Sequence, residues 1–176
     1  MPEILAEKEK KLANERPGCC LTRVPLDLTD DDARRAFFSR LEQEARLVLV
    51  VTEGLLLYLT TEQVTALTRD LHTHARFRWW LTDLVSPFVL GFYNMWWDNE
   101  LRHGNASLQF APEEGERFFS RAGWHVVEFR STMEEASRLN RNMPFGSLWQ
   151  LIVRCSDKTV QKAYRKMSCF LLLERD

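Results

Sequence analysis

The stretch Leu47-Val48-Leu49-Val50-Val51-Thr52-Glu53-Gly54-Leu55-Leu56-Leu57-Tyr58-Leu59 decides the fold. Residues 47–51 are all apolar and lack the alternation of a strand that faces water on one side. A continuous apolar strand is typical of the centre of a parallel sheet, where both faces are buried. Glu53 follows between two apolar runs, where a charge is costly unless it is paired or solvated by a cleft. We therefore predict a central parallel strand that ends in a ligand-binding turn at Glu53.

Helical and strand patterns alternate on both sides of this strand. The alternation predicts one α/β domain over residues 1–176, with a mainly parallel sheet and helices on both of its faces. The last two predicted strands lie far apart in the sequence, so one of them can be antiparallel. The predicted helices are 2–14, 30–45, 60–71, 87–101, 112–122 and 132–141, and the predicted strands are 19–24, 47–51, 77–83, 124–129 and 168–174.

The composition is that of a soluble globular protein, with 45% hydrophobic and 28% charged residues. A formal net charge of −1 gives no broad electrostatic reason to expect nucleic acid or an anionic membrane as a partner. The charged N-terminus does not resemble a signal peptide, and the apolar stretch 47–59 is shorter than the ~20 residues that span a bilayer. The four cysteines form no C-x-x-C pair. We expect a cytoplasmic protein with reduced thiols and no bound metal.

Carboxylates follow three of the predicted strands. Asp27 comes shortly after residues 19–24, Glu53 follows the central strand, and Asp83 ends the strand 77–83. In open α/β sheets ligands bind beyond the carboxyl ends of the strands, so these side chains can accept hydrogen bonds from ligand hydroxyl or ammonium groups. For Asp27 or Asp83, capping of a following helix is an equally good explanation. For Glu53 a ligand role is favoured, because Gly54 beside it permits close approach of a ligand.

Other candidate sites have simpler explanations. His72-Thr73-His74 suits an exposed helix end better than a metal site. The aromatic segment 92–97 fits a core better than a pocket. Residues 88–97 with Gln109 and Phe110 are also candidates for the lining of a substrate pocket. The basic segment 157–167 is expected to be a solvated helix or linker. The sequence contains no G-x-S-x-G, H-E-x-x-H or G-x-x-x-x-G-K-[ST] motif, so serine hydrolase, zinc protease and P-loop chemistry lack their central residues.

Several segments, taken in order, resemble the leucine carboxyl methyltransferase family, and most closely its bacterial S-adenosylmethionine-dependent members. The likeness extends to about Arg138, whereas residues 140–166 fit the family pattern poorly. It is carried by Pro2-Glu3-Ile4-Leu5 with Lys8, Asp27-Leu28, Glu53-Gly54-Leu55-Leu56-Leu57-Tyr58-Leu59, Arg78-Trp79-Trp80-Leu81-Thr82-Asp83-Leu84 and Gln109-Phe110-Ala111-Pro112-Glu113-Glu114-Gly115.

The resemblance implies a Rossmann-like class I methyltransferase fold and S-adenosylmethionine as the cofactor. It places Asp27 and Leu28 beside the adenine, and Glu53 with Gly54 at the methionine end. Tyr58 matches an aromatic position near the methyl-transfer site, and with Phe110 it is expected to bind the acceptor. No residue is identified as a catalytic base.

The family begins with two strands and a glycine-rich Asp-x-Gly-x-Gly turn that do not occur in these residues. The expected fold is therefore an N-terminally truncated class I sheet without its first two strands. The expected function is O-methylation of a carboxylate or hydroxyl on a small molecule or protein. The alternative is a catalytically inactive methyltransferase-like binding protein. An open sheet edge would also allow a homo-oligomer to form.

Overall fold

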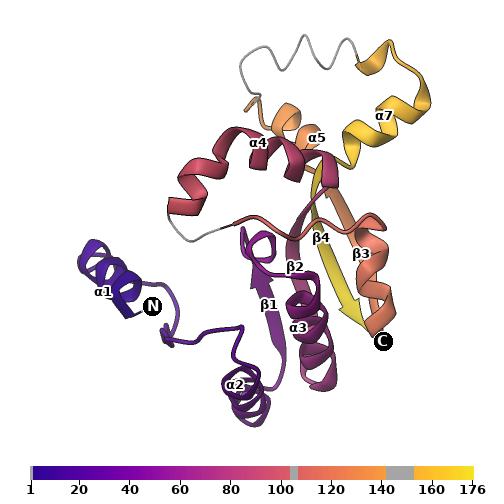
Figure 1. Cartoon of the computed structure of the whole chain (residues 1–176). Helices are drawn as coiled ribbons and strands as arrows, with labels where there is room; N and C mark the ends of the chain where they lie inside the picture. Colours follow the sequence, from indigo (N-terminus) through magenta and orange to yellow (C-terminus); the bar gives the residue numbers. More distant parts are fainter. Residues whose placement is uncertain (1, 104–106, 142–152) are drawn as a thin grey trace.

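A computed structural model describes residues 2–103, 107–141 and 153–176 (Figure 1). Short helices and strands alternate along most of the chain, as the sequence predicts. In order, the elements are α1 (Pro2–Lys11), α2 (Asp31–Glu44), β1 (Val48–Thr52), η1 (Leu56–Tyr58), α3 (Thr61–Thr73), β2 (Phe77–Val85), α4 (Pro87–His103), η2 (Gly115–Ala122), β3 (Trp124–Ser131), α5 (Thr132–Arg138), α7 (Lys158–Arg165) and β4 (Ser168–Arg175).

The strands form one mixed sheet in the order β1-β2-β4-β3. β1 and β2 are parallel, and Thr52 lies opposite Thr82 at their carboxyl ends. β4 pairs antiparallel with both β2 and β3. The predicted α/β class is confirmed, as is the expectation that one of the last two strands is antiparallel.

β1 lies at the edge of the described sheet, so the prediction of a central strand buried on both faces is wrong for these residues. Val48 and Val50 pack against the core, whereas Leu49 and Val51 are 54% and 58% exposed. The cover of helices on both faces is likewise incomplete over β1. An exposed apolar strand edge is uncommon in folded proteins, because it offers unpaired backbone groups to other chains.

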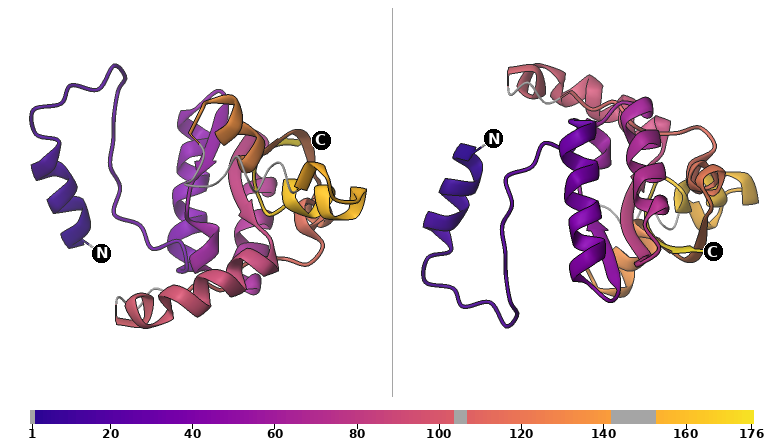
Figure 2. Two further views of the ribbon diagram at one scale, coloured as in Figure 1. Left: turned by 90° about the horizontal axis from the view of Figure 1, so that it is seen from above. Right: turned by 90° about the horizontal axis from the view of Figure 1, so that it is seen from below.

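Residues 19–24 do not form the predicted strand. They lie in an extended coil between α1 and α2, and this coil and α1 stand apart from the body of the molecule in both views of Figure 2. A strand needs a neighbour for its backbone hydrogen bonds. In a doubly wound sheet of order 3-2-1-4, two strands separate the third strand from the fourth. In the expected fold, residues 19–24 would be the third strand and β1 the fourth. Among the described residues no strand occupies those positions beyond β1.

The core lies between the sheet and the helices α2, α3 and η2. Its centre is aromatic: the Trp80 ring packs edge-on against Phe119 at 5.2 Å and against Trp124 at 5.7 Å between centroids. The Trp124 indole also donates a 3.1 Å hydrogen bond to the Thr68 carbonyl of α3. Each fully buried large apolar side chain contributes about 1.5–3 kcal/mol. Much of the aromatic content therefore serves packing.

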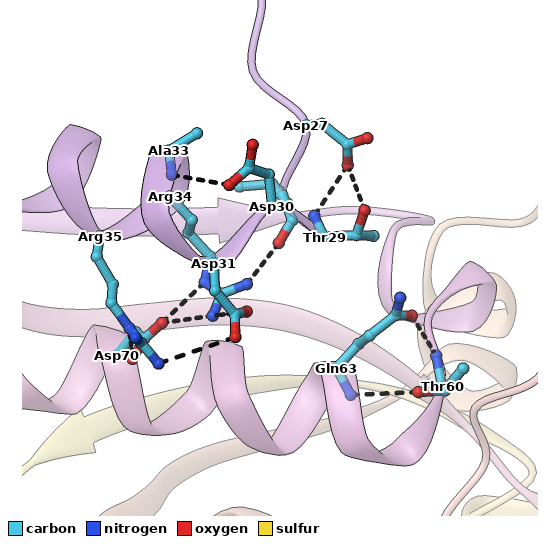
Figure 3. A network of polar contacts seen from close by, with 11 residues as sticks. Asp27, Thr29, Asp30, Asp31, Ala33, Arg34, Arg35, Thr60, Gln63 and Asp70 are labelled. Carbon is cyan, nitrogen blue, oxygen red and sulfur yellow. Dashed lines mark hydrogen bonds and ion pairs between the residues drawn. The ribbon is translucent and has the colours of Figure 1, made fainter.

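A buried arginine joins α2 to α3 (Figure 3). The Arg34 side chain is 0% exposed, and its Nε donates to Asp70 of α3 at 2.9 Å. Its Nη1 donates to the Leu28 carbonyl at 2.6 Å, which also ties down the chain before α2. α2 starts at the cap Asp30, whose side chain accepts a hydrogen bond from the Ala33 N–H. α3 starts with a capping box between Thr60 and Gln63.

Candidate functional site

The turn after β1 is bonded to the end of β2. The backbone N–H of Gly54 donates a 2.9 Å hydrogen bond to the Asp83 carboxylate. Gly54 has φ of +59°, a left-handed conformation that glycine adopts without strain. No atom lies within 4 Å of the position that a Cβ would take at Gly54, so there is space beside the turn. Two of the three predicted strand-end positions, at Glu53-Gly54 and Asp83, are thus brought together.

A buried chain of hydrogen bonds holds the two strand ends beneath this turn. The Trp80 indole donates to the Thr52 hydroxyl at 2.9 Å, and Thr52 donates to the Thr82 hydroxyl at 2.8 Å. Thr82 in turn donates to the Asp83 carbonyl at 3.2 Å. Bonds in such a chain polarise one another and are strengthened by the low dielectric of the interior. The chain fixes the strand ends and gives the turn a rigid base.

Glu53 is exposed to solvent at the tip of this turn. Among the described residues its carboxylate has no hydrogen-bond or ion-pair partner. The desolvation cost expected between the two apolar runs is avoided, because Glu53 is exposed. A carboxylate in this position can accept hydrogen bonds from an ammonium or hydroxyl group of a ligand.

The segment before η2 is bonded to η1 on the far side of the turn. The Leu57 carbonyl accepts hydrogen bonds from the backbone N–H of Gln109 at 2.7 Å and of Phe110 at 3.3 Å. Tyr58 is 43% exposed, so its ring is open to a ligand. Phe110, the other predicted acceptor contact, is 1% exposed and packs against Phe118 in the core. The burial of Phe110 assigns its side chain to packing in this structure.

Asp27 and Leu28 lie just before α2 and have local partners. Asp27 accepts hydrogen bonds from the hydroxyl of Thr29 at 2.7 Å and from its N–H at 2.9 Å. The hydroxyl bond, followed by the N–H bond, lowers the pKa of the Asp27 carboxyl. In the described residues no hydrogen bond or ion pair joins Asp27 or Leu28 to Glu53 or Gly54. Their predicted place beside an adenine stays a prediction.

The start of α4 is next to the strand ends, because this helix begins two residues after β2. The aromatic segment within it was predicted to be core, and this is wrong for the described side chains. Phe88, Phe92, Met95 and Trp96 recur at helical spacing and are 71%, 45%, 72% and 66% exposed. This exposed apolar surface on α4 leaves the acceptor-pocket alternative open.

His72 and His74 are not the exposed helix end that the sequence suggested. His74 is 8% exposed, and its Nδ1 lies 2.6 Å from the Glu42 carboxylate. That hydrogen bond lowers the pKa of Glu42. The His72 ring stands edge-on against Trp124, and burial lowers its pKa. Both histidines therefore hold α3 against its neighbours.

The thiols are unpaired, since all four cysteines are free. Burial raises the pKa of the Cys169 thiol in β4 to about 12, so this side chain is a neutral apolar group at physiological pH. None of the described helices is long and apolar enough to cross a membrane.

Comparisons with known proteins agree with this layout. Residues 1–72 match the profile of the family described as leucine carboxyl methyltransferase, which confirms the predicted resemblance from α1 through almost all of α3. No curated protein matches the chain. The crystal structure of a DUF574 family protein from Streptomyces avermitilis is similar in fold, with a TM-score of 0.61 and 11% sequence identity. The match covers 99% of this chain and 62% of that one, so the chain spans less than two thirds of the similar protein.

Proposed function

We propose that the chain is part of a methyltransferase that binds S-adenosylmethionine at the carboxyl ends of β1 and β2. One observation carries the proposal: the turn with Glu53 and Gly54, inside the family match, is bonded to Asp83 at the end of the neighbouring parallel strand. This is the edge at which open α/β sheets bind their ligands. We extend the proposal to a class I methyltransferase sheet, of which β1, β2, β4 and β3 form one side.

The residues at this edge fit the cofactor. Glu53 supplies an exposed carboxylate for the ammonium group of the methionine moiety. The open space beside Gly54 admits a ligand close to the backbone. The Asp27-Leu28 segment is proposed to reach the adenine, and its present hydrogen bonds are with Thr29, Asp30 and Arg34. The cofactor supplies an activated methyl group on a sulfonium.

The protein's part in such a reaction is to hold acceptor, methyl and sulfur in line and to exclude water. Asp83 orients the turn. The chain of hydrogen bonds through Trp80, Thr52 and Thr82 keeps the base of the turn rigid. Tyr58 flanks the turn and is proposed to contact the acceptor. A carboxylate acceptor is anionic at neutral pH and needs no general base, whereas a hydroxyl acceptor would need one. The set of side chains at this edge therefore suits an oxygen acceptor that is already ionised.

Calorimetric titration of the chain with S-adenosylmethionine and S-adenosylhomocysteine tests the proposal. Glu53→Ala is expected to weaken binding at least about tenfold, the effect of losing one charge-assisted contact. Glu44→Ala removes another exposed carboxylate, at the end of α2, and serves as the matched control. Equal affinity of Glu53→Ala and the parent chain would overturn the role of Glu53. Absence of binding of either ligand would overturn the function for this chain.

A further inference from the structure

A cavity lies between α7, β3 and η2, away from the proposed cofactor edge. Its volume is about 550 Å³. Val126 and Phe129 of β3 form its apolar floor, and both pack against the core. Lys158 and Lys162 line it from one side of α7, where their spacing of four residues places them one above the other. The cavity contains none of the residues proposed to bind the cofactor or the acceptor.

The cations around this cavity outnumber the anions. Arg165 is paired with Glu134 at 2.6 Å, and Lys166 with Glu116 at 2.5 Å. Lys158 and Lys162, by contrast, form no ion pair with any residue in the described ranges. Asp157, the nearest carboxylate in sequence, is occupied in capping α7 through the N–H groups of Thr159 and Val160.

Two unpaired ammonium groups one helical turn apart repel each other weakly. An anion between them removes this repulsion and accepts hydrogen bonds from both. The apolar floor adds a requirement, because Val126 and Phe129 gain from contact with an apolar group rather than with water. Cationic walls above an apolar floor match a ligand with one charged end and one apolar end.

We propose that this cavity binds an organic anion, with a carboxylate or phosphate held by Lys158 and Lys162 and an apolar group seated on Phe129. The site goes beyond the proposed methyltransferase function and does not depend on it. A carboxylate and a phosphate would be recognised in the same way, as anions that accept hydrogen bonds from both lysines. Benzoate and phenyl phosphate distinguish between them.

The test uses the whole chain and amide chemical shifts in NMR titrations with benzoate, phenyl phosphate and the neutral analogue benzyl alcohol. Benzoate or phenyl phosphate is expected to shift the signals of Phe129 and of α7 with a dissociation constant in the millimolar range. The tighter of the two identifies the preferred anion. Lys158→Ala/Lys162→Ala is expected to weaken that binding about tenfold or more, because two charge-assisted contacts are lost.

The matched control is Lys10→Ala/Lys11→Ala, which removes the same charge from exposed positions on α1. It is expected to leave the affinity unchanged. An equal loss in both double variants would show attraction to net charge alone and would overturn the site. Equal binding of benzyl alcohol and the anions would overturn the role of the lysines. Unchanged signals of Phe129 and α7 with either anion would also overturn the proposal.

Discussion

Gly54 and Asp83 come from different strands, and the N–H of the first donates to the carboxylate of the second at 2.9 Å. The bond joins the turn that carries Glu53 to the end of β2. It gives Asp83 a structural role that differs from both explanations considered for it, a ligand contact or a helix cap. The geometry of the proposed cofactor edge therefore depends on a residue that need not touch the cofactor.

Asp83→Ala should release the turn after β1. The loss of this partly exposed hydrogen bond is expected to cost about 0.5–1.5 kcal/mol and to speed hydrogen exchange of the Gly54 amide. NMR-detected exchange measures the effect directly. Asp83→Asn keeps a side-chain oxygen as acceptor and should retain most of the protection. Equal exchange rates in the parent and Asp83→Ala would contradict the assigned role.

Thr52→Val should destabilise the fold, because it leaves the buried Trp80 N–H without an acceptor. An unsatisfied buried donor costs about 1–3 kcal/mol. Urea unfolding followed by circular dichroism gives the difference. Thr73→Val makes the same substitution at an exposed position of α3, and the expected change there is smaller. If both variants lose the same stability, the hydrogen-bond chain is not what holds the strand ends.

Arg34→Met should separate α2 from α3. Removal of one partner of a buried ion pair costs about 3–5 kcal/mol, since Asp70 is left without its main counter-ion. The Asp70 side chain is only 13% exposed, so water compensates poorly. Arg40→Met changes an exposed arginine of the same helix and is the control. Thermal unfolding should give a clearly lower midpoint for Arg34→Met than for Arg40→Met. Similar midpoints would contradict the role of Arg34 in holding α2 against α3.

Gly123→Ala should be destabilising for two reasons. Gly123 ends η2 with φ of +86°, which costs an L-residue at least about 1 kcal/mol. A Cβ there would also lie 2.5 Å from Nε2 of His72. Gly18→Ala, in the open coil with no atom within 4 Å, is the control and should change the unfolding midpoint little.

Protonation of His72 should destabilise the fold at mildly acidic pH. Burial, followed by the positive charge of Arg175, lowers the pKa of His72 in the folded chain. The unfolded chain therefore binds more protons below about pH 6.5, the ordinary histidine value, and stability falls as the pH drops through that point. His72→Gln should flatten this part of the urea-unfolding profile between pH 7.5 and 5.5. An unchanged pH dependence of stability in His72→Gln would contradict this role of His72.

The strands of the sheet are predictable because the residues of each strand form a recognisable local pattern. Residues 47–51 and 169–173 are continuous apolar runs, and they coincide closely with the strands β1 and β4. Position within the sheet is not a local property. The sequence pattern of β1 is that of a central strand, and the absence of a described neighbour on one side places it at the edge. The segment 19–24 fails as a strand for the same reason, since no described strand lies beside it.

The proposed cofactor edge was only partly predictable. Strand ends and carboxylates identify Glu53 and Asp83 as candidate ligand contacts, but the hydrogen bond from Gly54 depends on the turn's left-handed backbone. Phe110 illustrates the opposite case, because its motif suggests a ligand contact while packing against Phe118 buries it. The basic segment 157–167 was the only sign of the cavity beside α7 in the sequence. The cavity itself could not be predicted, because it forms between α7 and β3.

The open edge of β1 also bears on the fate of the protein in a cell. A bare apolar strand is what holdase chaperones bind and what quality-control proteases select. A second copy or a different chain that covered Leu49 and Val51 would shield the protein from both.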